Sequence, residues 1–217
     1  MPEDSSHFAA SGSRPPTFSV ARTFPQFGRL TGVLIGISVV VAIVSVLGQK
    51  ESVVGLLRIT DQDYAEDSLP EVAHGQIWRL VTPIFLHYSI LHILFNMMCL
   101  KTLGTAIEAI AGTGRLLALT LVIGVISNLG QFYFAGPAFG GMSGVVYGLF
   151  GYVWMKTRFD KRSGYFISQQ SVLMMVGWLV ACMLNFIPGV ANYAHGFGIV
   201  AGMVWGVVEA KVRIPRD

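Results

Sequence analysis

Two polar residues inside apolar, glycine-rich segments have side chains suited to nucleophilic chemistry. Ser143 lies within residues 139–144, where glycines let the backbone turn tightly, and His195 lies in the last apolar segment. An imidazole that accepts the proton of a serine hydroxyl activates it as a nucleophile. We expect Ser143 at a helix start, where its backbone N–H can bind a developing oxyanion. A serine there is also a common N-cap, and a lone histidine on an apolar helix is often a core residue, so both interpretations stay open.

His92 and Asn96 form a second polar pair within an apolar segment. They are four residues apart, so both side chains project from one face of a helix and can act on the same group. The alternative is that each satisfies a neighbouring helix through an interhelical hydrogen bond.

Carboxylates are missing from the apolar segments. All six aspartates lie outside them, and Glu108 and Glu209 fall at predicted helix ends. This distribution excludes an aspartyl protease of the membrane, a His-Glu-x-x-His zinc protease and a carboxylate proton relay. The two cysteines, Cys99 and Cys182, lie in apolar segments and provide no metal site. We therefore expect no cofactor and no metal.

The composition indicates a membrane protein. Of the 217 residues, 53% are hydrophobic and 12% are charged, against roughly 25% charged in soluble domains, and the mean hydropathy is +0.61. The net charge of +3 is scattered, with no long basic run, which excludes a nucleic-acid partner. Apolar runs long enough to suggest an all-α protein with six transmembrane helices occur at residues 30–48, 89–107, 116–134, 142–155, 171–187 and 192–208.

The segments between and around these runs set the expected organisation. Residues 1–29 form a polar tail, residues 30–209 the six-helix domain and residues 210–217 a short C-terminal tail. A cleavable signal peptide is the competing interpretation of the first run, but no small-residue cleavage site follows it. Residues 49–88 form a long, acidic first loop whose second part has an interfacial composition.

The distribution of basic residues predicts the orientation. Twelve Lys and Arg residues fall on the side of both termini and three on the opposite side. The positive-inside rule then places both termini in the cytoplasm and the long first loop outside the membrane. The second, fourth and sixth helices start at the outer side, so His92, Asn96, Ser143 and His195 share one leaflet and can converge on one site.

The motifs, taken in order, resemble those of the rhomboid intramembrane serine proteases of the bacterial six-helix type. The resemblance covers residues 76–209 and rests on Trp78-Arg79, His92-x-x-x-Asn96, Gly141-Met142-Ser143-Gly144 with Tyr147, and Ala191-Asn192-Tyr193-Ala194-His195-Gly196. It implies cleavage of single-pass membrane proteins within the bacterial inner membrane, among membrane lipids, at a site facing the extracytoplasmic side.

The resemblance also implies a role for each matched residue. Ser143 would be the nucleophile and His195 the general base, in a Ser-His dyad without a carboxylate. The Ser143 backbone N–H, His92 and Asn96 would form the oxyanion hole, and Tyr147 would pack on the catalytic imidazole. Trp78 and Arg79 would be structural, Asn192 would support the motif of the last helix, and Gly198 would let that helix approach the serine helix.

Two departures and two alternatives accompany this interpretation. Gly148 stands where the family often has alanine, and the tail is too short for the folded N-terminal domain of some relatives. A transporter with a broken helix near Gly140-Gly141 is one alternative, weakened by the missing ionisable pathway. The other is a catalytically silent rhomboid-like protein that binds membrane clients, which the presence of both Ser143 and His195 disfavours.

We further expect a polar cavity near His92, Asn128, Gln131 and Asn192, and substrate entry by motion of the fifth helix and residues 187–191.

Overall fold

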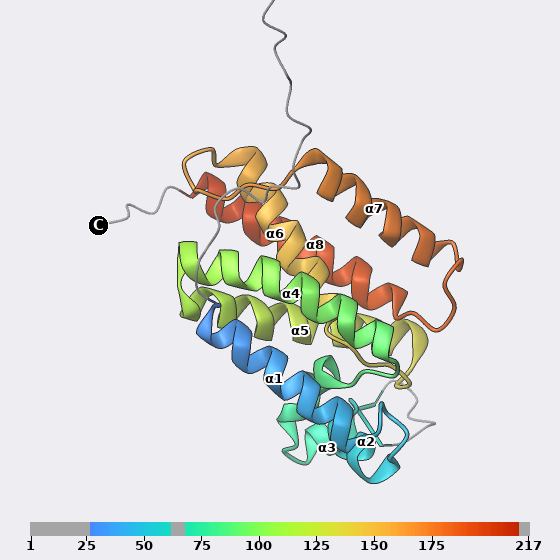
Figure 1. Ribbon diagram of the computed structural model, residues 1–217. Coiled ribbons are helices and arrows are strands. Elements are labelled where there is room, and N and C mark those ends of the chain that lie inside the picture. The colour runs from blue at the N-terminus through green and yellow to red at the C-terminus, as the bar shows by residue number, and fades with distance from the viewer. Residues whose placement is uncertain (1–26, 62–67, 213–217) are drawn as a thin grey trace, which may run out of the picture.

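The computed structural model describes residues 27–61 and 68–212, and the regular elements of these residues are all helices (Figure 1). The predicted tail at residues 1–26, part of the first loop and residues 213–217 lie outside the described residues. The elements are α1 (Arg29–Val44), α2 (Glu51–Leu57), α3 (Pro70–Ala73), the 3-10 helices η1 (Ile77–Leu80) and η2 (Thr82–Phe85), α4 (Ile90–Ala111), α5 (Thr113–Ala135), α6 (Ser143–Phe159), α7 (Gln169–Met183) and α8 (Asn192–Lys211).

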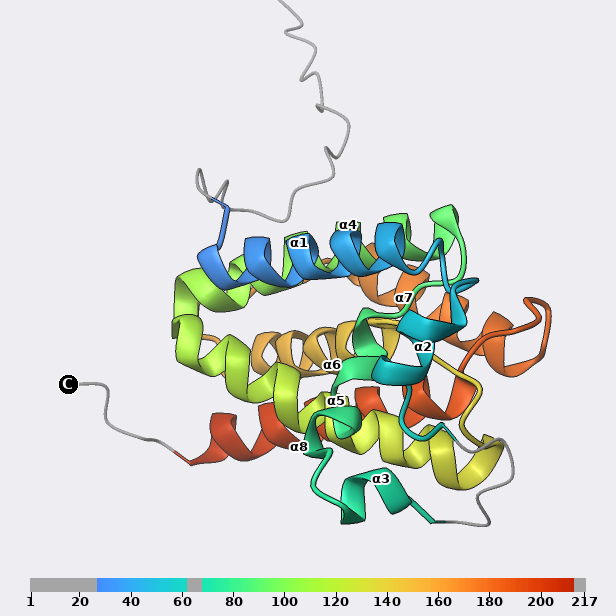
Figure 2. The same ribbon diagram turned by 90° about the horizontal axis from the view of Figure 1, so that it is seen from below.

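Helix α6 occupies the centre of the bundle. Most of its residues are buried, because α4, α5 and α8 each pack against it. Helix α1 lies beside α4 at one edge of the bundle (Figure 2), and α7 lies at the opposite side of the view in Figure 1, where Cys182 is its buried residue. The helix that begins with Ser143 is therefore enclosed by protein over most of its length and becomes exposed at its last residues, Arg158 and Phe159.

Helices α6 and α8 form the most extensive contact of the fold, and glycines make it possible. A Cβ atom on Gly198 would overlap the Gly144 carbonyl oxygen, and one on Gly202 would overlap the Gly148 carbonyl oxygen. The two backbones therefore touch directly, which is the packing that small residues permit in membrane helices.

Replacing Gly202 with alanine is expected to lower the thermal stability markedly. The new methyl group would push against backbone rather than a flexible side chain, and such overpacking costs about 1–3 kcal/mol or more. Thermal unfolding in detergent, followed by circular dichroism, measures the effect. Gly177→Ala in α7 is the matched control, because nothing lies within 4 Å of its added Cβ. Equal melting temperatures for the two variants would contradict this account of the glycine contacts between α6 and α8.

Helix α1 is fastened at its start to the end of α4. The Glu108 carboxylate accepts hydrogen bonds from the backbone N–H groups of Leu30 and Thr31, at 2.8 and 3.0 Å, and from the Thr31 hydroxyl. These N–H groups have no partner within their own helix. Glu108 thus acts as the N-terminal cap of α1 from another helix.

Several predicted boundaries are wrong. The run expected to continue to residue 48 ends as a helix at Val44, because Val46, Leu47 and Gly48 adopt left-handed backbone angles. The fifth long helix spans residues 169–183 rather than 171–187, and Asn185, with φ of 57°, follows its end. The connection at residues 49–88 contains two short α-helices and two 3-10 helices that the sequence analysis did not predict.

Helices α4 and α5 are long and apolar enough to cross a membrane, and α1 and α7 are shorter apolar helices. Large apolar side chains are exposed on the outer faces of these helices, among them Ile43, Leu94, Leu121 and Leu173. A face of this kind suits lipid rather than water.

Candidate active site

Ser143 and His195 meet at the starts of α6 and α8. Ser143 is the first residue of α6 and His195 the fourth of α8, and the close contact of these helices brings them together. The distance between Ser143 Oγ and His195 Nε2 is 2.8 Å, which is a hydrogen bond. His195 is buried, whereas Ser143 is partly exposed. The pair has the geometry in which an imidazole can take the proton of a serine hydroxyl.

The Tyr147 ring packs against the His195 imidazole. The two ring centroids are 4.7 Å apart with the planes tilted by 41°, and the Tyr147 hydroxyl donates to the Met175 carbonyl of α7 at 3.3 Å. His195 Nδ1 is buried without a hydrogen-bond partner among the residues that the structure describes. No carboxylate in that part of the chain therefore holds this imidazole.

His92 lies on the side of α4 that faces the loop before Ser143, and Asn96 follows one turn later in the same helix. A Cβ atom on Gly141 would come within 2.6 Å of His92 Nε2, so the imidazole lies against the backbone two residues before Ser143. Gly141 has φ of +123°, a conformation that favours glycine. Asn96 is buried, and its Nδ2 donates to the His92 carbonyl at 2.9 Å, which leaves its second N–H for another acceptor.

His87 is a site residue that the sequence analysis missed. It is fully buried, and its ring lies 4.9 Å from the ring of His92. Nδ1 lies 3.0 Å from the Phe85 carbonyl, so Nδ1 carries the proton and Nε2 accepts from the Met142 backbone N–H at 3.5 Å. His87 therefore supports the backbone immediately before Ser143. Its burial depends on a loop about fifty residues away, which the local sequence does not signal.

Acidification is expected to destabilise the protein through His87. Burial, assisted by His92, lowers the pKa of His87 from its ordinary value of 6.5 to about 4. The unfolded chain therefore binds this proton at a higher pH than the folded chain does. The stability due to neutral His87 is complete above pH 6.5 and is lost as the pH falls towards 4, by up to about 3 kcal/mol. Melting temperatures between pH 7 and 4 should fall less steeply for His87→Asn than for the wild type. The exposed His74→Asn variant is the control, and an identical slope for His87→Asn and wild type would contradict the prediction.

Three amide side chains near the site bind backbone groups of other elements. Asn128 Nδ2 donates to the Leu80 carbonyl at 2.9 Å, Gln131 Oε1 accepts from the Ala194 N–H at 3.1 Å, and Asn192 Nδ2 donates to the Cys182 carbonyl at 2.9 Å. Each amide thus joins α5 or α8 to a neighbouring segment. The structure therefore shows these three amides in contact with backbone groups, and the expected polar cavity stays a prediction.

Trp78 and Arg79 lie in η1, within the first connection. Arg79 is buried and donates to Gln76 and to the backbone carbonyls of Gly55 and Arg58, at 2.6–2.9 Å. It therefore holds the first connection together. The Trp78 side chain is half exposed.

The fold and the site define a helical membrane protein with a serine-histidine pair where two of its helices begin. A rhomboid domain model matches residues 74–212, and the chain belongs to the rhomboid family. It is 38% identical to the rhomboid protease GlpG of Salmonella paratyphi A and 39% identical to that of Salmonella choleraesuis, each over 135 residues that make up 62% of this chain and 49% of the relative. The chain thus spans about half the length of the curated relatives it matches. The resemblance to rhomboids drawn from the motifs is confirmed.

Proposed function

We propose that this chain is an intramembrane serine protease that cleaves membrane proteins in or near their transmembrane helices. The observation that carries the proposal is the 2.8 Å hydrogen bond between Ser143 Oγ and His195 Nε2, in a partly exposed position on a membrane-protein scaffold. The similarity to rhomboid proteases supports it.

The proposed reaction proceeds through an acyl-enzyme. His195 Nε2 accepts the Ser143 hydroxyl proton as Oγ attacks the carbonyl carbon of the scissile peptide bond. The tetrahedral intermediate then collapses, the C–N bond breaks, and His195 donates its proton to the leaving amine. Water, deprotonated by His195, hydrolyses the ester and restores the Ser143 hydroxyl. Packing on Tyr147 provides the orientation of the imidazole that an aspartate provides in a triad.

The oxyanion of the intermediate has three candidate donors. The Ser143 backbone N–H lies in the first turn of α6, where N–H groups lack intrahelical partners. His92 Nε2, against Gly141, and the second N–H of Asn96 lie on the neighbouring face of α4. We assign the oxyanion hole to these three groups.

The topology we propose has six membrane crossings, formed by α1, α4, α5, α6, α7 and α8. Residues 1–29 and 210–217 would be cytoplasmic tails flanking the domain at residues 30–209, and the site would face the extracytoplasmic side of the bacterial inner membrane. The positive-inside count supports this orientation.

The substrates we propose are single-pass transmembrane proteins, which would reach Ser143 past α7. This helix makes few contacts with the rest of the bundle, and its Trp178 meets Phe95 of α4 with ring centroids 6.1 Å apart. Residues 187–191, which include Pro188 and Gly189, connect α7 to α8 and could act as a hinge.

The proposal is tested with the purified chain reconstituted in liposomes with a single-pass membrane reporter. We expect one cleavage in or near the reporter's transmembrane helix, and covalent labelling of Ser143 by a fluorophosphonate probe. Mass spectrometry of the products and of the labelled peptide identifies both sites. A folded chain that neither cleaves several helix-destabilised reporters nor reacts with the probe would favour the client-binding alternative.

A further inference from the structure

A cluster of charged and hydroxyl side chains lies at the end of α6 and α8 opposite the candidate active site. The Glu209 carboxylate is at its centre and accepts from the Tyr152 hydroxyl, which lies 3.2 Å from each oxygen. Lys156 Nζ lies 2.7 Å from Asp160 and 4.0 Å from Glu209. Arg115 Nη1, from α5, lies 3.5 Å from Glu209. The proposed reaction uses none of these groups.

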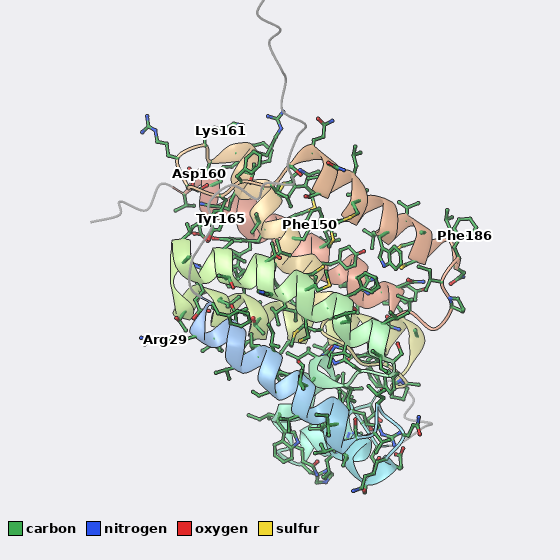
Figure 3. The ribbon with its side chains drawn as sticks, viewed as in Figure 1. Arg29, Phe150, Asp160, Lys161, Tyr165 and Phe186 are labelled. Atoms are coloured by element: carbon green, nitrogen blue, oxygen red, sulfur yellow. The ribbon has the colours of Figure 1, made fainter. Side chains whose placement is uncertain are left out.

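The cluster is balanced in charge, and its central pair, Lys156 and Glu209, is shielded from solvent, whereas Arg115 and Asp160 are partly exposed. The Lys156 side chain is 2% exposed and that of Glu209 is 12% exposed, and two basic groups face two acidic ones. Figure 3 shows Asp160 and Tyr165 together at this end of the bundle, far from Phe186 at the other end. A buried ion pair is weak evidence for stability, because desolvation offsets much of the attraction, and its best-attested role is to specify one register.

The contact between α6 and α8 needs interactions that fix its axial register. Where Gly198 meets Gly144 and Gly202 meets Gly148, backbone faces backbone, so these two positions contribute no interlocking side chains that would oppose sliding along the helix axis. The hydrogen bond from Tyr152 to Glu209 is directional, and the 4.0 Å ion pair of Lys156 with Glu209 adds charge attraction, so both contacts join α8 to α6 at one axial position. If either helix slid, the Tyr152 hydroxyl would lose Glu209 as its acceptor, and the Lys156 ammonium would lose Glu209 while keeping Asp160 at the end of its own helix.

We propose that the Tyr152–Lys156–Glu209 cluster sets the register of α6 against α8 and thereby holds Ser143 at hydrogen-bond distance from His195. Lys156 follows Ser143 by 13 residues and Glu209 follows His195 by 14, so each helix transmits the register over about 20 Å. A misplacement of about 1 Å at reacting groups can cost about 100-fold in rate. Tyr152, Lys156 and Glu209 are therefore positioning residues, an inference that rests on the proposed protease function.

Turnover of the membrane reporter provides the first measurement. We expect Lys156→Met to lower kcat per folded molecule by about 10- to 100-fold with KM unchanged, and Lys156→Arg to retain activity because it keeps the charge. Arg158→Gln, an exposed basic residue in the same turn of α6, is the matched control and should match the wild type. If Lys156→Met does not fold, Tyr152→Phe provides the same test, since it keeps the ring and removes the hydroxyl contacts with Glu209.

A second measurement does not depend on catalysis. Nitroxide labels are attached at Phe159 of α6 and Val200 of α8, which are both exposed, in a Cys99→Ser, Cys182→Ala background. Electron–electron double resonance then measures the distance between the labels, which reports the axial offset of the two helices. We expect a shifted or broader distance distribution in Lys156→Met. Wild-type kcat in that variant, or an unchanged distribution, would overturn the proposal. If the wild type neither cleaves the reporter nor reacts with the fluorophosphonate probe, but Lys156→Met still shifts the distance distribution, the protease function is refuted and the register role is supported.

Discussion

Replacing Ser143 with alanine is expected to abolish cleavage of a membrane reporter, with turnover falling by at least about 1,000-fold. Alanine has no atom that can attack the scissile carbonyl, so the ester with the enzyme cannot form. The remaining donors around the site can polarise a carbonyl but cannot replace the nucleophile. Initial rates of product release in liposomes of identical lipid composition measure the loss.

The fold should survive this substitution, because the hydrogen bond from Ser143 to His195 is a single contact between α6 and α8, and the glycine contacts between these helices remain. Ser127→Ala is a matched control. Ser127 is a buried serine whose hydroxyl donates to the Gly124 carbonyl and which lies against Gly144, so this variant should keep its activity. Cleavage at the wild-type rate by Ser143→Ala would place the nucleophile elsewhere.

The long helices could be predicted from the sequence because each is a nearly uninterrupted apolar run. The all-α rhomboid fold is confirmed, whereas the number of membrane crossings stays a prediction. The errors occur where a helix ends without a sequence signal. Val46 and Leu47 adopt left-handed angles that are uncommon for bulky residues, so the end of α1 could not be predicted from residue type.

The site was predictable to the extent that its residues follow helix periodicity or a motif. The spacing of His92 and Asn96 predicted one helix face. The resemblance implied that the last helix approaches the serine helix at Gly198, and in the structure a Cβ atom on Gly198 would overlap the Gly144 carbonyl oxygen. His87 could not be predicted, because its role depends on long-range contact with Met142. The cluster around Glu209 was not predicted for the same reason, since a glutamate at a helix end is expected from the sequence to be exposed to solvent.

Replacing Asn96 with alanine is expected to lower kcat by about 100- to 1,000-fold, because the loss of one oxyanion donor costs about 2.7–4 kcal/mol of transition-state stabilisation. KM should change little, since the donor acts on charge that develops only after Ser143 attacks. Initial rates at a series of reporter concentrations in the bilayer separate the two constants. Asn96→Asp should be similarly impaired, because it keeps the shape and removes the N–H donors.

The loss could instead arise in the helix, since Asn96 Nδ2 also donates to the His92 carbonyl. Thr102→Ala separates the two causes. Its hydroxyl donates to the Met98 carbonyl, four residues earlier in the same helix, at 3.1 Å, but Thr102 is exposed and lies farther from Ser143 along α4. We expect Thr102→Ala to match the wild type in kcat, and both variants to melt within a few degrees of it. Unimpaired turnover in Asn96→Ala would remove this side chain from the oxyanion hole and leave the Ser143 N–H and His92 as its donors.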